Sequence, residues 1–352
     1  MILRKRVIRA MNKKNNWFYN INKDSDVVMS SRIRLARNIK NFKFLNRLSS
    51  EEKQKIILQV KDIFENINLG KDKNLKFIDM NKVSNISALS LAERHLISYD
   101  MATKPKDRAV FLSEDETISV MVNEEDHIRL QVFSNNFDIY DIYNQAQKID
   151  SLLDERLKYS FDSELGYLTE CITNIGTGMR VSVLLHLLAL DRCGAINKLS
   201  NTLSKMGFII RGSFGEGSEV KGAFYQISNQ VTLGLSETTV IENLKSVVSQ
   251  IMAQERATRS SLIKNDINFQ DTIMRAFGVI KYSKVINYEE FIELASLVRV
   301  GICGNLITEI DLKTINYLIN NLGPANISNN QQSELLAFDR DIIRAAVISQ
   351  NI

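Results

Sequence analysis

Two short apolar runs separated by five polar residues place an antiparallel hairpin in the first half of this chain. Residues 118–122 and 128–133 have the pattern of strands, and the stretch between them reads NEEDH. Two strands joined by so short a connection can pair as an antiparallel hairpin. Three adjacent carboxylates, Glu124, Glu125 and Asp126, would crowd an exposed hairpin tip. Like charges repel, so we expect a cation to lie beside them.

Composition places the chain among ordinary globular proteins. Its 352 residues are 44% apolar and 24% charged, which suffices for two domains and a large core. A net charge of +4 is too small to indicate nucleic acid by itself. Three widely spaced cysteines indicate neither a disulfide framework nor a zinc site, which favours the cytoplasm. The basic start lacks the apolar run of a signal peptide, and no segment reads as a membrane span.

Strand and helix patterns alternate over the first 261 residues. A helix is expected after Ser49, with Glu52 completing a capping box. The other helices are predicted at 143–158, 176–190, 196–206 and 237–261. Strands are predicted at 27–35, 109–112, 118–122, 128–133, 208–211 and 224–230.

The pattern changes after residue 262, where we find helical periodicity alone. Helices are predicted at 288–300, 312–322 and 331–349. We therefore divide the chain into a basic N-terminal segment (1–23), a mixed domain (24–261) and a helical domain (262–352). The patterns thus predict a mixed domain of strands and helices first and a smaller all-helical domain second.

Two arginines of the segment SSRIRLARN share one strand face. Side chains alternate along a strand, so Arg32 and Arg34 point the same way, about 7 Å apart. Their guanidinium groups would make a fork for a polyphosphate. A solvated strand face would show the same pattern, so this segment alone decides nothing.

A cysteine precedes a Gly-x-Gly sequence in CITNIGTGMR. If Gly176 opens a helix, its N-terminus would favour the thiolate of Cys171, and Arg180 would lie in the first turns. The alternative is that Cys171 is simply a small core residue.

Two further segments contain charged residues that could bind a ligand. RGSFGEGSE, residues 211–219, has three glycines between two predicted strands, but it matches neither a P-loop nor GxGxxG. An ordinary hairpin loop would look the same. In RDIIRA, Arg340 and Arg344 share a helix face, with Asp341 beside them. Arginines in this arrangement usually face solvent and form salt bridges with acidic residues.

Taken in order, SSRIRLARN, NEEDHIR, CITNIGTGMR, RGSFGEGSE and ISNQ resemble the catalytic domain of the phosphagen (guanidino) kinases. The resemblance runs from about Asp24 to the C-terminus. It implies an α+β fold, with an antiparallel sheet flanked by helices and followed by a smaller all-α C-terminal domain. The GTG and GEG variants, the lack of a helical domain before SSRIR and the terminal RDIIRA are similar to the bacterial protein-arginine kinases. One departure is Ile172, where the superfamily commonly has proline. Losing that rigid turn either shifts the Cys171 thiolate or leaves it in place.

The resemblance implies a site for each substrate. ATP, with its Mg²⁺, would contact Ser30, Ser31, Arg32, Ile33, Arg34, His95, Arg129, Arg180, Val181, Ser182, Val183, Leu184, Arg211, Gly212, Ser213, Phe214, Gly215 and Glu216. Glu125 and Glu216 would grip the substrate guanidinium beside Cys171, with Glu124 near the magnesium carried by ATP and no metal site of the protein's own. Phosphoarginine would bind at Arg340, Asp341, Arg344 and Ala345.

This chemistry suits the residue types. A guanidinium is a poor nucleophile because its charge is delocalised, so carboxylates must orient it and remove a proton. Glu125 is our candidate for that base. Arginines would neutralise the charge that spreads over the transferred phosphoryl group. The glycine loop that carries Glu216 could close and exclude water.

The resemblance further implies protein substrates with exposed arginine, an activator protein, a Clp-type unfoldase that degrades marked clients, and a homodimer. It implies an allosteric enzyme of the stress response. One alternative is a kinase for free arginine or another small guanidino compound. A second is a catalytically weak adaptor that reads phosphoarginine. A nucleic-acid binder ranks last, because the chain has no basic stripe with interleaved aromatic residues.

Overall fold

The computed structural model describes residues 17, 20–66, 74–212 and 220–352, which form two compact units. The sheet unit contains residues 31–182 and 228–245. The helical unit contains the described parts of 1–30, 183–227 and 246–352. Because each unit combines segments that are distant in sequence, the units do not follow the chain order. We describe each unit by itself.

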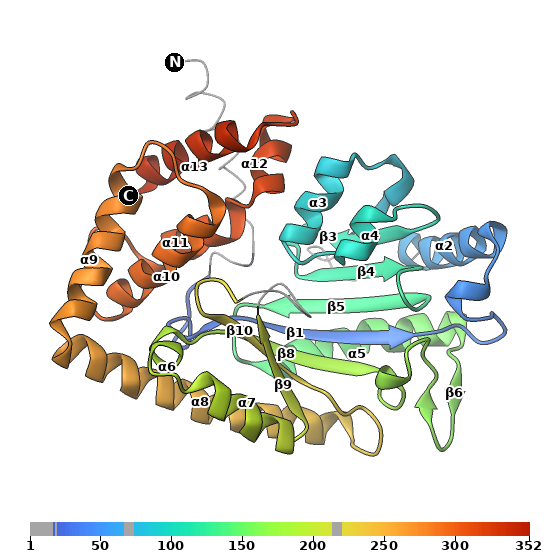
Figure 1. Ribbon diagram of the computed structural model, residues 1–352. Coiled ribbons are helices and arrows are strands. Elements are labelled where there is room, and N and C mark those ends of the chain that lie inside the picture. The colour runs from blue at the N-terminus through green and yellow to red at the C-terminus, as the bar shows by residue number, and fades with distance from the viewer. Residues whose placement is uncertain (1–16, 18–19, 67–73, 213–219) are drawn as a thin grey trace. The chain divides into compact units, whose positions relative to one another are not determined.

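Six strands of the sheet unit lie in the order β2-β3-β4-β5-β1-β8 (Figure 1). Their bounds are β1 Val28–Arg37, β2 Leu75–Asp79, β3 Ala109–Ser113, β4 Ile118–Val122, β5 Ile128–Ser134 and β8 Met179–His186. The pairings β2–β3, β3–β4, β4–β5 and β5–β1 are antiparallel. The predicted antiparallel sheet, with its central hairpin, is confirmed.

Helices cover the sheet unit, and most of their termini follow from local sequence. Ser49 and Glu52 form the predicted capping box, which satisfies free backbone N–H groups at the start of α2. The apolar side of α5 packs against β5 and buries Ile142, Ala146 and Leu153. The helices of this unit are α2 Ser50–Glu65, α3 Asn85–Glu93, α4 Tyr99–Thr103 and α5 Ile139–Leu157, and the short hairpin β6 Phe161–Asp162 with β7 Gly166–Tyr167 completes it.

The helical unit holds the C-terminal part of the chain. α9 packs on α10 and α13, α10 on α11, and α12 on α13 around one apolar core (Figure 1). The elements here are α6 Leu188–Arg192, α7 Ile196–Lys205, β9 Phe208–Gly212, β10 Phe224–Asn229, α9 Ile267–Tyr282, α10 Tyr288–Cys303, α11 Leu312–Asn321, α12 Pro324–Gln331 and α13 Ala337–Asn351. Helix α8, Glu237–Asn265, has residues in both units. Residues 262–352 contain helices and no strand, as predicted.

Some local predictions are wrong. Residues 176–190 form strand β8 and the short helix α6 instead of one buried helix. Their continuous apolar run is equally typical of a strand that is buried on both faces, and periodicity alone cannot distinguish the two. Helix α9 was missed, and residues 331–349 form the end of α12 and then α13. Across the described residues, no helix is both long and apolar enough to cross a membrane.

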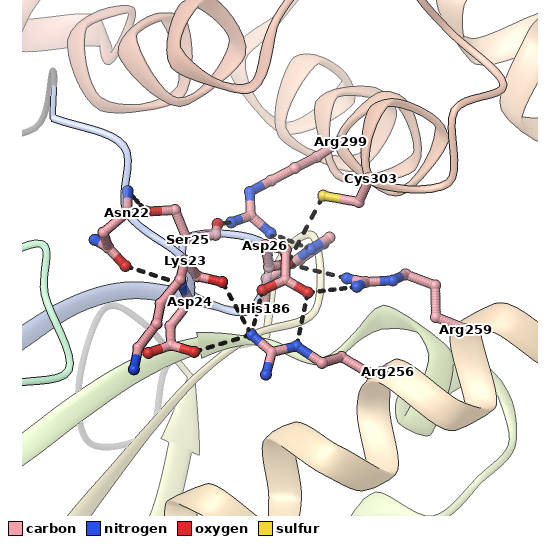
Figure 2. Close-up of polar contacts among 10 residues, drawn as sticks. All are labelled: Asn22, Lys23, Asp24, Ser25, Asp26, His186, Arg256, Arg259, Arg299 and Cys303. Atoms are coloured by element: carbon pink, nitrogen blue, oxygen red, sulfur yellow. Dashed lines mark hydrogen bonds and ion pairs between the residues drawn. The ribbon is translucent and has the colours of Figure 1, made fainter.

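A completely buried arginine organises the helical unit (Figure 2). Arg299 on α10 donates from Nε to Asn316 Oδ1 at 2.9 Å and from Nη1 to His186 Nδ1 at 2.8 Å. It also donates to the backbone carbonyls of Ser25 and Asp26. The Asp26 carboxylate is held in turn by Arg256 and Arg259 of α8. Within the helical unit, Arg299 therefore joins the segment before β1 to His186, α10 and α11.

A buried histidine organises the turn of the central hairpin in the sheet unit. His127 accepts the backbone N–H of Ile39 at Nδ1 (3.0 Å) and lies 2.9 Å from the Lys43 carbonyl at Nε2. The ring must therefore be neutral, with its proton on Nε2. Burial lowers the pKa of His127 to about 4. Through these two hydrogen bonds, His127 holds the backbone of Ile39 and Lys43 next to the turn.

We predict that Arg299→Met lowers the free energy of unfolding by about 3 kcal/mol, because it leaves buried hydrogen-bond acceptors without a donor. Urea denaturation checks this. Arg275→Met, which removes an exposed arginine on α9, is the control and should leave the midpoint nearly unchanged. Equal effects of the two substitutions would contradict a role for Arg299 in holding the unit together.

We also predict that acid destabilises the fold through His127. Its pKa is lower in the folded state than in the unfolded chain, so below about pH 6.5 the unfolded chain binds more protons. Stability should therefore fall by about 1.4 kcal/mol per pH unit for this group between pH 6.5 and 4. His127→Gln keeps a donor and an acceptor and should make the profile shallower by that amount. An unchanged pH profile would contradict this.

Candidate active site

Several of the predicted arginines lie on one face of the sheet. In the β1–β5 register Arg34 lies opposite Gln131, and Ala36 lies opposite Arg129, so these side chains share a face. Arg32 donates to Ser182 on β8 and to Gln131, both at 3.4 Å. The opposite face of β1 carries apolar residues into the core. The alternation predicted from the sequence is therefore present.

Four arginines of this sheet unit lie close enough to influence one another's charge. Burial and the nearby charges of Arg129 and Arg180 lower the pKa of Arg32 to about 10. The pKa of Arg34 is lowered further, by burial and by Arg129, Arg32 and Arg180. Such crowding of like charges is unfavourable until an anion joins it. A bound polyanion would relieve this repulsion.

The acidic turn is not the exposed hairpin tip that the sequence suggested. Glu124 and Asp126 are buried, and Glu125 is half-buried. Arg129 forms ion pairs with both Glu124, at 2.5 Å, and Glu125. The cation beside two of the three acids is thus an arginine of the chain itself. Both carboxylates therefore already pair with a guanidinium, which is the group that the resemblance assigns to Glu125 as its substrate.

His95 lies next to a backbone carbonyl that joins it to the hairpin. Leu96 O accepts from Ser119 on β4 at 2.6 Å and from Gln131 on β5 at 3.3 Å. Burial and the charge of Arg32 lower the pKa of His95 to about 4. His95 therefore lies within the field of the arginine cluster and is neutral near pH 7.

Cys171 does not precede a long helix. It caps a single 3-10 turn, η4 Ile172–Asn174, so the expected helix N-terminus is missing. The glycines have another purpose. A Cβ on Gly176 would lie 2.2 Å from Thr232 O, and both Gly176 and Gly178 have positive φ. They allow the loop after Cys171 to pack against neighbouring backbone before β8 begins.

The departure at Ile172 leaves the local backbone in a form that proline also adopts. Ile172 is the first residue of η4, and Cys171 before it is extended, with φ −91° and ψ 121°. The Cys171 thiol is half-buried and lies 3.0 Å from Thr173 Oγ1. Ile172 itself is 80% exposed. The turn therefore forms without proline.

Other predicted nucleotide contacts fall in three places. Arg180, Val181 and Ser182 lie on β8 in the sheet unit, together with Ser31 and Ile33 on β1. Ser30, Val183, Leu184, Arg211 and Gly212 belong to the helical unit, with the last two on β9. Ser213, Phe214, Gly215 and Glu216 lie outside the described residues.

The RDIIRA residues lie on α13, and its two arginines differ. Arg344 is 1% exposed and donates to the carbonyls of Leu322 and Ile286, both at 2.9 Å, and to Asp341 Oδ1 at 2.6 Å. Burial lowers its pKa, although Asp341 opposes that shift. Arg340 is half-buried and donates to Leu335 O at 2.9 Å. Only Arg340 fits the surface position that helical spacing suggested; Ala345 is buried.

Sequence reasoning missed the polar residues that support these charges. Gln131 contacts both Arg32 and the Leu96 carbonyl, and Asn38 bonds to Asp126. Gln131 was visible as the polar residue that alternates with apolar ones on β5. Asn38 gave no periodic signal, because it lies just past the end of a strand.

Family models match both parts of the chain. Residues 55–258 match the ATP:guanido phosphotransferase C-terminal catalytic domain. Residues 266–352 match the protein-arginine kinase McsB C-terminal domain. The first match alone spans more than half of the sequence.

Curated relatives match over nearly the whole chain. A protein-arginine kinase of Clostridium acetobutylicum is 41% identical over 338 residues, covering 96% of this chain and 99% of the relative. A protein-arginine kinase of Clostridium tetani is 40% identical over 339 residues, covering 96% and 98%.

Solved structures of phosphagen kinases share the fold. Lombricine kinase superposes with a TM-score of 0.60 at 21% identity, covering 69% of each chain. The duplicated taurocyamine kinase from Schistosoma mansoni also gives 0.60 at 21% identity, covering 73% of this chain and 38% of that one. With its arginine-lined sheet face, its acidic turn and these relatives, the chain belongs to the ATP:guanido phosphotransferase family and, within it, to the protein-arginine kinases.

Proposed function

We propose that this enzyme transfers the γ-phosphoryl group of ATP to arginine side chains of proteins. The observation that carries the proposal is the placement of opposite charges on one sheet face, formed by β1 and β5, and at the turn that precedes β5. Arg32, Arg34 and Arg129 present positive charge on the sheet face, while Glu124 and Glu125 present negative charge at its turn. One side suits a triphosphate and the other suits a guanidinium.

The nucleotide side would bind by charge. Arg32, Arg34 and Arg180 are crowded enough to depress the pKa of Arg32 and Arg34, and the ATP phosphates would relieve that repulsion. Mg²⁺ carried by ATP would neutralise further charge on the phosphates. Glu124 is the acid that would lie nearest to it. Binding ATP would cancel the repulsion and hold the γ-phosphate fixed against these donors.

The acceptor side would bind by replacing Arg129. A substrate guanidinium that pairs with Glu125 has one nitrogen free to attack the γ-phosphorus. Glu125 takes the proton from that nitrogen as the N–P bond forms, and ADP leaves with the electron pair of the broken P–O bond. Arg129 is then released from Glu125 toward the phosphates. Cys171, and Glu216 by family resemblance, would complete the grip on the guanidinium.

Protein substrates are favoured over small guanidino compounds by the C-terminal region. Residues 266–352 match a domain named for protein-arginine kinase. We propose that this domain reads phosphoarginine, with Arg340 and Asp341 as contacts and buried Arg344 as the residue that fixes Asp341. An activator protein, a homodimer and degradation of marked clients by a Clp-type unfoldase in the cytoplasm belong to the same proposal.

The central test is chemical. The protein is incubated with ATP, Mg²⁺ and an unfolded protein, and phosphorylated residues are identified by mass spectrometry under conditions that preserve acid-labile bonds. We expect phosphate on arginine. Phosphate on serine, threonine or tyrosine alone would refute the proposal. Strong preference for free arginine over the protein would favour the small-molecule alternative.

We predict that Glu125→Gln lowers kcat by about 100-fold or more, because an amide cannot accept the proton. ATP affinity should change little, since the phosphates contact other groups. Glu116→Gln, which alters a carboxylate paired with Arg94 in the preceding turn, is the matched control. Steady-state kinetics and nucleotide titration give both values. Activity that survives Glu125→Gln would show that another group is the base.

We predict that Arg340→Ala weakens binding of free phosphoarginine, measured by calorimetry, while arginine phosphorylation itself persists. Asp341→Ala should weaken binding and also lower the melting temperature, because it leaves buried Arg344 without its carboxylate. The control is Arg275→Ala with Asp271→Ala, an exposed pair on α9. Unchanged phosphoarginine binding in Arg340→Ala would reduce RDIIRA to a structural motif.

A further inference from the structure

The third acid of the central turn behaves unlike its neighbours. Asp126 has no exposed surface, whereas Glu125 is half-buried. Its Oδ1 accepts from Asn38 Nδ2 at 2.7 Å and from the backbone N–H of Glu170 at 2.8 Å. Oδ2 has no hydrogen-bond partner among the described residues. Burying a carboxylate is costly, so these contacts require an explanation.

Both polar atoms of the Asn38 side chain form hydrogen bonds. Its Nδ2 group donates to Asp126 and also to the Leu168 carbonyl at 3.0 Å, while its Oδ1 accepts the His127 N–H at 3.0 Å. Together, Asp126 and Asn38 grip the backbone at both Leu168 and Glu170. We call these two residues the loop clamp.

The clamped backbone leads directly to the cysteine. Glu170 immediately precedes Cys171, and Thr169 between the two clamped residues donates from Oγ1 to the Cys171 carbonyl at 2.8 Å. That carbonyl also accepts from Asn174 N at 3.0 Å. The position of Cys171 is therefore set from the NEEDH turn through its neighbours, and not by the thiol's own contacts.

We propose that Asp126 and Asn38 are positioning residues that hold Cys171 in register with Glu125. The proposal deepens the function proposed above and rests on it for the catalytic consequence. Asp126 follows Glu125 in the chain, so one turn presents the base with one residue and fixes the thiol loop with the next. Ile172 stands at the start of η4 without the rigidity of proline. The clamp supplies that rigidity from outside the loop.

The charges at the clamp agree with a scaffold. Burial raises the pKa of Asp126, and its contacts from Glu170 N and Asn38 oppose that rise. Burial raises the pKa of Glu170, and the charges of Asp126 and Glu125 add to it. The charges of both acids therefore act on Glu170, which directly precedes Cys171. This agrees with a short distance between the cysteine loop and Glu125.

The test compares graded changes at Asp126 in the full-length enzyme. Asp126→Ala removes the acceptor for both donors, whereas Asp126→Asn keeps an oxygen at the Oδ1 position. Asn123→Gly is the matched control, because Asn123 is a buried residue of the same turn whose Nδ2 donates instead to Lys53 O and Asp107 O. Its positive φ of 60° suits glycine.

Three kinds of measurement are made on each variant. The first is steady-state kinetics, which give kcat and KM for ATP in arginine phosphorylation. The second is the rate of Cys171 alkylation by iodoacetamide, followed on the Cys171 peptide by mass spectrometry, and the third is the melting temperature. For Asp126→Ala we expect kcat to fall on the order of 100-fold with little change in KM for ATP. Cys171 alkylation should accelerate several-fold as the loop loosens. Asp126→Asn should restore most of kcat and most of the slow alkylation of the wild type. Asn123→Gly should lower the melting temperature and leave kcat and the alkylation rate unchanged.

Two results would overturn the clamp. One is Asp126→Ala with a lower melting temperature but unchanged kcat and alkylation. The other is Asn123→Gly matching Asp126→Ala in all three measurements. If Asp126→Ala does not yield folded protein, Asn38→Ala removes the other half of the clamp and is judged by the same criteria. Failure of the wild type to phosphorylate arginine would refute the proposed function, while the alkylation rates would still decide the clamp.

Discussion

The hydrogen-bond register between β1 and β5 is the constraint on which this site depends. It sets Arg34 against Gln131 and Ala36 against Arg129, which fixes the spacing of guanidinium groups that repel one another. A slip of one residue would move all of them to the apolar face. The ladder can hold them because the opposite face of the same strands is buried in the core, where Ile33, Leu35 and Leu130 have almost no exposed surface.

The three acids of the NEEDH turn show how position divides one chemical type into different roles. Glu124 and Glu125 form ion pairs with Arg129. Asp126 turns inward and holds backbone instead. His127 completes the turn with two further backbone contacts. Four successive residues thus join the substrate site to the scaffold, so little of the turn is free to change without a cost in either stability or activity.

Buried arginines connect the segments of the helical unit by hydrogen bonds. Arg299 and Arg344 each satisfy carbonyl oxygens of segments that are distant in sequence, and neither is a surface salt bridge. A guanidinium suits this because its several donors lie in one plane and remain charged. The same planar set of donors that suits arginine to phosphate in general lets it join helices here. Residue type alone therefore does not distinguish a ligand from a structural support.

The sequence by itself determined the antiparallel hairpin, the shared face of Arg32 and Arg34, the capping box at Ser49 and the helical character of residues 262–352. These features follow from short-range periodicity and local hydrogen bonding, which a single segment carries in full. Only the tertiary structure decided that residues 179–186 form a strand, that Asp126 and Arg344 are buried, and that Asn38 reaches the cysteine loop. Whether an apolar run becomes strand or helix, and whether a charge meets water or a carbonyl, depends on partners more than a hundred residues away in some cases, and no local pattern encodes them.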